Sequence, residues 1–210
     1  MKHRFPSIVC CVLLGLAGGA ASTLAAEKTA PVQPPSEGKG AAFTEWALST
    51  PNAFWRIEGG VLIGENNAAL TGNMLWTKRS YKDFTIEFDV RWEGPIDSGV
   101  MFRTPVLQMQ IGTSISLKKE LTGSFYTGDA KARYPEEGKA KDAERLLKPG
   151  QWNRLRLEVR GDSFNVWING EKASSYTNAK YSGEAPIGLQ IHPKLKMKVE
   201  YRDIHLVELR

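Results

Sequence analysis

Amide, guanidinium and imidazole side chains recur beside apolar residues at two places in this 210-residue sequence. Gln108 and Gln110 alternate with Leu107, Met109 and Ile111. Gln190 and His192 alternate with Leu189 and Ile191, and Arg103 stands opposite Phe102 in the same manner. Successive side chains of a β-strand point to opposite faces, so the polar groups of each segment should share one face. They offer the donors and acceptors that sugar hydroxyls need, although ordinary solvated surface would show the same pattern.

Other chemistry has little support in the sequence. A nucleophile elbow, a phosphate-binding glycine loop, a dinucleotide fingerprint and a His-Glu-x-x-His pattern are all missing, and no cofactor is expected. His192 and His205 are the only histidines after His3, which are too few for a histidine-rich metal site. Among six tryptophans, Trp76 is our candidate for a sugar-stacking side chain, although tryptophan is more often part of a core.

The first 26 residues are expected to form a cleaved signal peptide. Lys2, His3 and Arg4 precede an apolar run, and the segment Thr23-Leu24-Ala25-Ala26, which contains small residues, closes it. The alternative is a transmembrane anchor, but the run is short for a membrane span. We therefore expect a periplasmic or secreted protein without a membrane span after cleavage. Because Cys10 and Cys11 lie within this segment, the mature chain would have no thiol.

Composition also limits the partners. Removal of residues 1–26 takes away two basic residues and no acidic ones, which leaves 26 basic against 23 acidic residues and a net charge of +3. Basic and acidic residues alternate instead of forming a basic stripe, so a nucleic-acid partner is not expected. The sequence does not predict an oligomeric state.

Short strands must position the candidate site residues. Residues 27–41 are rich in Pro and Gly and predict a linker, and residues 42–210 predict one domain. In residues 84–92, Phe84, Ile86, Phe88, Val90 and Trp92 alternate with polar residues, which is typical of an antiparallel strand with one buried face.

The rest of the chain repeats this pattern. We expect about ten to thirteen strands, with hairpin turns at Gly59-Gly60 and Asn169-Gly170, and a long surface excursion over residues 128–149. These features predict an all-β antiparallel sandwich.

A set of ordered motifs extends this interpretation. They are Trp55-Arg56-Ile57-Glu58-Gly59-Gly60-Val61-Leu62, Leu75-Trp76-Thr77, Tyr81-Lys82-Asp83-Phe84, Asp97-Ser98-Gly99-Val100-Met101-Phe102-Arg103, Trp152-Asn153, Trp167-Ile168-Asn169-Gly170 and Pro186-Ile187-Gly188-Leu189-Gln190-Ile191-His192. From about Phe43 to Leu209 the chain resembles the 3-keto-disaccharide hydrolase-like domain family. The resemblance implies a jelly-roll sandwich of the concanavalin A-like lectin/glucanase type.

The resemblance also implies an activity. Members with an assigned activity are exported bacterial proteins that cleave glycosides oxidised at carbon 3 of glucose. The ketone acidifies the hydrogen at carbon 2, so a base can remove it, the enolate expels the anomeric substituent, and water adds back. This chemistry differs from that of glycosidases with two flanking carboxylates.

The sequence departs from the family at one position. The family's usual Glu-x-Gln strand aligns with Gln108-Met109-Gln110, and an amide cannot act as a general base. The resemblance therefore leaves His192 as the candidate base and Arg103 as an electrostatic stabiliser, with Gln108, Gln110, Gln190 and Trp76 as substrate-binding residues. The alternatives are a non-catalytic carbohydrate-binding module, which Gln108 favours, and a tethered structural domain.

Overall fold

The computed structural model describes residues 43–49 and 52–210. The predicted signal peptide (1–26) and linker (27–41) lie outside these ranges, so both stay predictions. Within the described ranges, no helix is both long enough and apolar enough to span a membrane.

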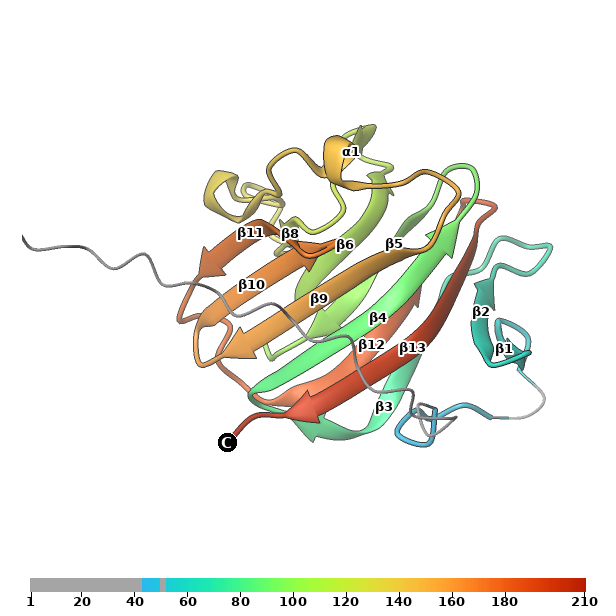
Figure 1. Ribbon diagram of the computed structural model, residues 1–210, viewed down its shortest axis with the longest axis horizontal. Coiled ribbons are helices and arrows are strands. Elements are labelled where there is room, and N and C mark those ends of the chain that lie inside the picture. Colours follow the sequence, from blue (N-terminus) through green and yellow to red (C-terminus); the bar gives the residue numbers. More distant parts are fainter. Residues whose placement is uncertain (1–42, 50–51) are drawn as a thin grey trace, which may run out of the picture. The chain divides into compact units, whose positions relative to one another are not determined.

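The described chain forms two antiparallel sheets (Figure 1). The seven-stranded sheet has the order β1-β2-β13-β4-β9-β10-β11, and the six-stranded sheet has the order β3-β12-β5-β6-β7 with β8 paired to β6. The strands are β1 (Trp55–Glu58), β2 (Val61–Glu65), β3 (Asn73–Tyr81), β4 (Phe84–Trp92), β5 (Asp97–Phe102), β6 (Leu107–Ser114), β7 (Lys119–Glu120), β8 (Phe125–Tyr126), β9 (Asn153–Arg160), β10 (Ser163–Ile168), β11 (Glu171–Thr177), β12 (Ala185–Ile191) and β13 (Lys198–Glu208). The predicted all-β sandwich fold is therefore confirmed.

Two of the predicted hairpins close in the conformation that glycine favours. Gly59 and Gly60 join β1 to β2 with φ angles of 56° and 80°, and Asn169 and Gly170 join β10 to β11 with φ angles of 51° and 87°. Positive φ at both central residues is the requirement of a type I′ turn, whose twist matches that of the flanking strands. These local turns fix the pairing of neighbouring strands.

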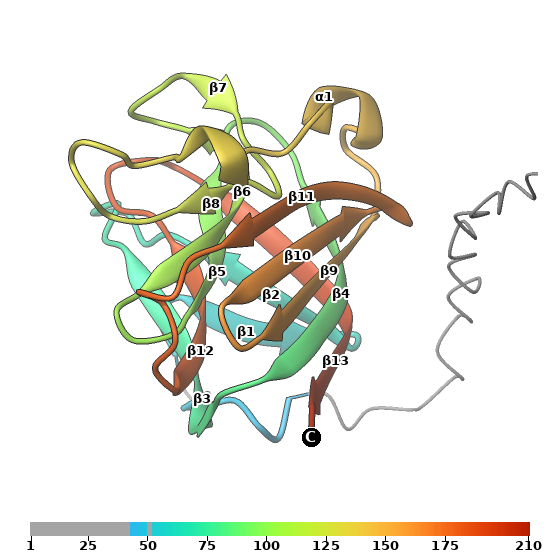
Figure 2. The same cartoon turned by 90° about the vertical axis from the view of Figure 1, so that its left-hand side faces the viewer.

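The core lies between the two sheets, which face each other as two layers (Figure 2). Phe84 of β4 packs edge-on against Phe102 of β5, with ring centroids 5.9 Å apart, and Phe102 meets Phe164 of β10 at 5.7 Å. Each of these contacts joins one sheet to the other. Aromatic packing therefore holds the inward faces of β4, β5 and β10 against one another.

Strand β4 confirms the predicted alternation for four of its five apolar residues. Phe84, Ile86, Phe88 and Val90 are fully buried. Trp92 is only partly buried against the core, so its prediction as a full core residue was wrong. It is the last residue of β4 and lines a small surface pocket with Leu147 and Pro149. A strand end has fewer covering neighbours than a strand centre, although its side chain has the same parity.

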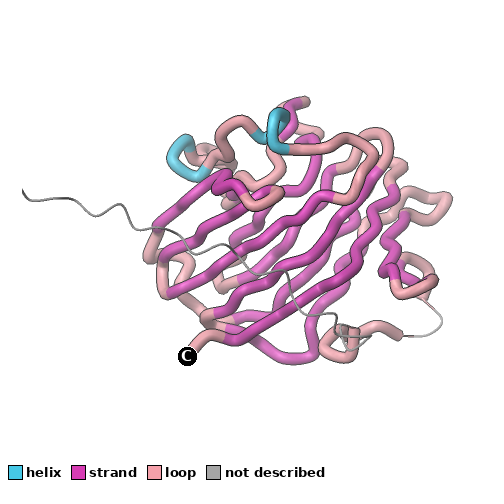
Figure 3. The backbone as a smooth tube through the Cα atoms, in the orientation of Figure 1, coloured by secondary structure: helices cyan, strands magenta, loops and turns pink. Residues whose placement is uncertain are grey.

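The segment between β8 and β9 contains the two short helices, η1 (Glu136–Gly138) and α1 (Ala143–Leu146), and is otherwise irregular (Figure 3). This corresponds to the predicted excursion over residues 128–149. It does more than cover surface, because its residues Arg133 and Tyr134 line a pocket on the six-stranded sheet.

Candidate functional site

Four of the predicted site residues meet at one pocket on the outer face of the six-stranded sheet. The pocket measures about 460 Å³, which is within the range of small-ligand sites. Its lining residues are Asp97, Met101, Gln108, Gln110, Ser114, Ile115, Ser116, Tyr126, Arg133, Tyr134, Gln190 and His192. The structure thus places Gln108, Gln110, Gln190 and His192 outward, as their alternation predicts, and brings them together in one pocket.

Strand register places Trp76 in the same row of the sheet. Gln108 pairs with Met101, Met101 with Gly188, and Gly188 with Trp76. A Cβ at Gly188 would lie 2.6 Å from atoms of the Trp76 ring, so the ring rests against the bare backbone of β12. Trp76 does not line the pocket, but it is 36% exposed on the same face. It is therefore positioned beside the site, not within it.

Gly99 provides the space in which the glutamines meet. It pairs with Gln110 in the middle of β5, and a Cβ there would lie 2.7 Å from Cγ of Gln108. Because Gly99 has no side chain, Gln108 lies across β5 and reaches β12. Its Nε2 donates to Oε1 of Gln190 at 3.3 Å.

A chain of hydrogen bonds links these side chains to Asp97. Nε2 of Gln110 donates to Oδ1 of Asp97 at 2.8 Å, and the backbone N–H of Ile115 donates to Oδ2 at 2.8 Å. Nε2 of Gln108 donates to Oε1 of Gln110 at 3.0 Å. Asp97, Gln108 and Gln110 are all buried, so the chain is shielded from competing water.

Two tyrosines form an aromatic wall of the pocket. The rings of Tyr126 and Tyr134 lie 5.2 Å apart, and the hydroxyl of Tyr134 donates to Oε1 of Gln110 at 3.0 Å. Burial raises the pKa of Tyr134 to about 12, and the charge of Asp97 adds to this although the Ser114 hydroxyl acts against it. The phenol therefore stays protonated and remains a donor at neutral pH.

The surroundings of His192 determine which ring nitrogen can accept a proton. Nδ1 lies 2.7 Å from the carbonyl oxygen of Pro193. A carbonyl oxygen only accepts hydrogen bonds, so Nδ1 carries the proton in the neutral ring and Nε2 keeps its lone pair. The ring is thus held in a tautomer that can act as a base through Nε2.

Arg103 does not belong to this pocket, and its predicted place beside the glutamines was wrong. Its side chain is fully buried, and Nη2 donates to Asp83 at 3.0 Å and to the carbonyl oxygen of Gly161 at 2.6 Å. Strand β5 ends at Phe102, and Arg103 adopts a left-handed backbone with φ of 69°. The alternation of side chains therefore stops one residue before Arg103. The guanidinium instead binds Asp83, between β3 and β4, and Gly161, between β9 and β10.

The sequence interpretation missed Asp97, Tyr126, Arg133 and Tyr134. Strand β5 begins at Asp97, which has the same parity as Gly99 and Met101. Extending the alternation backwards from Met101 would have found it. No local signal marks Arg133 or Tyr134, because they reach the sheet only through the path of a long loop.

Two further observations narrow the choice of site. No group of three or more His, Cys, Asp or Glu in the described part of the chain could hold a metal ion.

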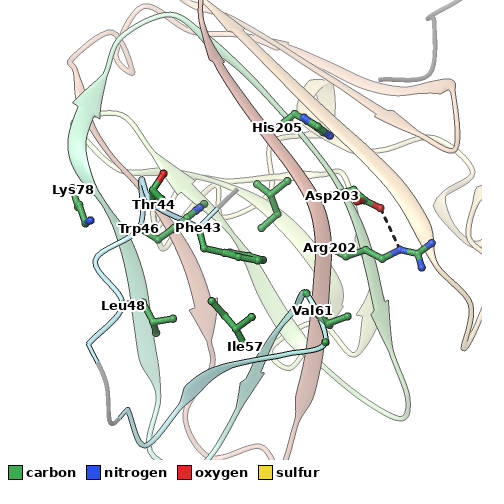
Figure 4. A pocket seen from close by; sticks show the side chains of 13 residues that line it. Phe43, Thr44, Trp46, Leu48, Ile57, Val61, Lys78, Arg202, Asp203 and His205 are labelled. Carbon is green, nitrogen blue, oxygen red and sulfur yellow. Dashed lines mark ion pairs between the residues drawn. The ribbon is translucent and has the colours of Figure 1, made fainter. Parts of the chain in front are cut away.

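A larger pocket, of about 850 Å³, lies beside β1, β2 and β13 (Figure 4). Its walls include the apolar side chains of Phe43, Leu48 and Ile57, and Arg202 is paired with Asp203. It contains none of the predicted site residues and no comparable chain of polar groups, so we prefer the smaller pocket.

Comparisons with known proteins identify the family and the fold of this chain. The sequence model of the 3-keto-alpha-glucoside-1,2-lyase-like domain matches residues 35–207, which confirms the family resemblance. Among curated protein sequences, no relative matches this chain.

Several solved structures share the fold. A protein from Parabacteroides distasonis, provisionally described as a glycosyl hydrolase, is 20% identical, with 81% of this chain and 96% of that chain covered and a TM-score of 0.60. The carbohydrate-binding module CBM66 from Bacillus subtilis is 15% identical over 78% and 95%, with a TM-score of 0.54. The carbohydrate recognition domain of Emp47p is 14% identical over 79% and 89%, with a TM-score of 0.52. At these identities the likeness concerns the fold alone.

Proposed function

Since this chain belongs to the 3-keto-alpha-glucoside-1,2-lyase-like domain family, we propose that it cleaves 3-keto-glucosides in the pocket on the six-stranded sheet. The observation that carries the proposal is the combination of a base-competent His192 with oriented amides in one pocket. A sugar needs groups that both donate and accept, and elimination needs a base near neutral pH.

The proposed reaction begins at carbon 2. Nε2 of His192 takes the proton, and the electron pair of the C2–H bond forms an enolate whose charge lies on the C3 oxygen. The enolate then forms a C1–C2 double bond and breaks the bond from C1 to the anomeric oxygen. The imidazolium returns its proton to that oxygen, so the leaving group departs as an alcohol. Water later adds to C1 and C2 of the unsaturated product and restores a 3-keto sugar.

Gln190 is our candidate for holding the enolate oxygen. Its Oε1 accepts from Gln108, so its Nε2 is the end available as a donor, and no described group accepts from it. An N–H donor aimed at developing negative charge lowers the barrier because the charge is greater in the transition state than in the substrate. This role replaces the one that we expected of Arg103. Trp76 would contact the part of the substrate that leaves.

The reaction is tested with 4-nitrophenyl 3-keto-α-glucoside and the unoxidised 4-nitrophenyl α-glucoside as its matched control. We expect nitrophenol release from the oxidised compound only, because only its ketone acidifies the C2 hydrogen. His192→Ala should lower kcat by at least about 100-fold. His205→Ala, which alters the histidine beside the other pocket, should leave kcat unchanged. Absence of release by the parent protein would refute the activity.

A non-catalytic carbohydrate-binding module is the second candidate, and Gln108 favours it. The family's usual acid is an amide here, and solved structures of the same fold include a carbohydrate-binding module. A parent protein that binds the 3-keto-glucoside in calorimetry but releases no nitrophenol would support the module.

We also propose that the protein is exported after cleavage near Ala26. The placement of Lys2, Arg4 and the apolar run supports this. N-terminal sequencing of the mature protein tests it, and a mature chain that retains Cys10 would contradict it.

A further inference from the structure

We infer that Asp97 fixes the direction of the hydrogen bonds made by Gln110, so that residue 108 must be an amide while residue 97 is a carboxylate. The negative charge of the site then lies on Asp97 instead of on residue 108. The hydrogen-bond inference is independent of the proposed function, and only its consequence for sugar binding rests on that function.

The carboxylate of Asp97 can only accept hydrogen bonds. Its two oxygens receive Nε2 of Gln110 and the backbone N–H of Ile115, each at 2.8 Å. If the Gln110 amide were reversed, its Oε1 would face a carboxylate oxygen without a proton between them. Gln110 must therefore turn its NH₂ group to Asp97 and its Oε1 to the other side.

Nε2 of Gln108 is surrounded by oxygen atoms. Oε1 of Gln110 already receives the Tyr134 hydroxyl, and it lies 3.0 Å from Nε2 of Gln108. The same Nε2 also faces the carbonyl oxygen of Ser98 at 3.2 Å and Oε1 of Gln190 at 3.3 Å. Three oxygens surround this atom, so position 108 requires a donor. Gln190 could reverse its free amide toward a Glu at this position, but the Gln110 and Ser98 oxygens could not turn away, so an ionised Glu would place negative charge against both in a buried site.

The orientation of the Gln108 and Gln190 amides decides which donor and acceptor the site leaves free for a ligand. Oε1 of Gln108 and Nε2 of Gln190 have no hydrogen-bond partner among the described residues, and they belong to adjacent side chains. One is an acceptor and the other is a donor. A sugar hydroxyl can donate to the first and accept from the second, so Asp97 prepares a hydroxyl-binding pair without touching the ligand itself.

The inference also explains the departure at Gln108. If Asp97 were an amide, Gln110 could reverse, its NH₂ group would face residue 108, and an acid would be accommodated there. The charge at position 97 and the amide at position 108 are thus two parts of one arrangement. Asp97 is a positioning residue in this account.

The test compares the melting temperatures of the parent, Asp97→Asn, Gln108→Glu and the double variant at about pH 7. Gln108→Glu should melt at least about 6 °C below the parent, because a buried charge would face oxygens. The double variant should recover at least half of that loss, since only there can Gln110 reverse and donate to the new acid. The carbonyl oxygen of Ser98 cannot reverse, so full recovery is not expected.

Gln190→Glu is a second comparison, at a half-buried position beside the buried Gln108. It introduces the same charge into the same pocket, but its carboxylate accepts from Nε2 of Gln108 just as Oε1 of Gln190 does. It should melt within about 3 °C of the parent, roughly 1 kcal/mol for a domain of this size. Equal destabilisation by Gln108→Glu and Gln190→Glu would overturn the inference.

The pH dependence of the melting temperature separates an effect of hydrogen-bond direction from an effect of altered packing. The melting temperature of Gln108→Glu should lie closer to that of the parent at about pH 4, where a glutamic acid can be protonated and donate. The other titratable groups of the pocket, Asp97, Tyr126, Arg133, Tyr134 and His192, are common to the parent, so the comparison at each pH isolates residue 108. A loss that does not change with pH would contradict the inference.

Additive effects of the two substitutions would also overturn it, as would a double variant that fails to fold when Asp97→Asn folds. If Gln108→Glu alone does not fold, recovery of folding in the double variant supports the coupling. No melting experiment requires a ligand. Coupled melting temperatures without 3-keto-glucoside binding by any variant would therefore refute the proposed function and leave the role of Asp97 standing.

Discussion

Replacement of Asp83 by Ala should destabilise the fold because it isolates the buried guanidinium of Arg103. Nη2 of Arg103 would keep only the carbonyl oxygen of Gly161, while Nε and Nη1 already lack partners in the described structure. Removing one partner of a buried ion pair costs about 3–5 kcal/mol. The side chain of Asp83 is 33% exposed, so we expect the lower end, about 3 kcal/mol.

This free energy corresponds to a fall in Tm of about 6–12 °C, at 2–4 °C for each kcal/mol in a domain of this size. Arg103→Met is the informative counterpart, because it removes the cation together with its unpartnered groups and keeps much of the volume. Replacing a buried charge by a packed apolar side chain is often nearly neutral, so we expect a loss of no more than about 1 kcal/mol. Differential scanning calorimetry of the two variants measures the contrast.

The pKa of Asp83 adds a second readout. Burial acts to raise this pKa, but hydrogen bonds from Arg103 and from the backbone N–H of Gly161 outweigh burial and lower it. A carboxyl with a lowered pKa stabilises the fold above its ordinary value of about 4, and this stabilisation is lost as the pH falls through the lowered value. Arg103→Met should therefore show a weaker loss of stability below about pH 4 than the parent.

Two results would refute this reasoning. If Asp83→Ala melts within about 2 °C of the parent, the ion pair does not support the fold. If Arg103→Met stays folded but loses 3-keto-glucoside cleavage, Arg103 belongs to the site and the structural role that we assign to it is wrong.

Three further predictions concern the pocket. Gly99→Ala places a Cβ 2.7 Å from Cγ of Gln108, so we expect calorimetric affinity for a 3-keto-glucoside to fall at least about tenfold, and unchanged affinity would contradict the role of Gly99. Trp76→Ala should weaken binding of 3-keto-sucrose about fivefold, from the loss of roughly 1 kcal/mol of stacking, and leave methyl 3-keto-glucoside unaffected. An equal effect on both ligands would argue against a contact with the leaving sugar. The absorbance of the parent and of Tyr134→Phe is followed in alkaline titrations. The difference between the two curves should show one phenol with a pKa of about 12. Since this pKa is raised, its contribution to stability is present below about pH 10 and is lost as the pH rises toward 12, and a step near 10 would contradict the burial argument.

The sequence by itself determined the fold class, the family and which residues of β4, β6 and β12 face outward. The alternation in residues 84–92 predicted a buried face, and the same rule placed Gln108, Gln110, Gln190 and His192 outward. These are properties of the extended backbone, whose side chains alternate whatever the strand packs against. Two-residue turns such as Asn169-Gly170 are equally local, because their φ angles depend on the residues within the turn.

Only the tertiary structure decided which outward residues form one site. The sequence position of Arg103 predicts an outward side chain. A left-handed backbone and an ion pair with Asp83 place it in the interior instead. Tyr134 reaches Gln110 because a long loop returns to the sheet, and Asp97 becomes a site residue because β5 extends back to it. Strand ends and loop paths depend on contacts between residues far apart in the chain, and a local pattern contains no information about those contacts.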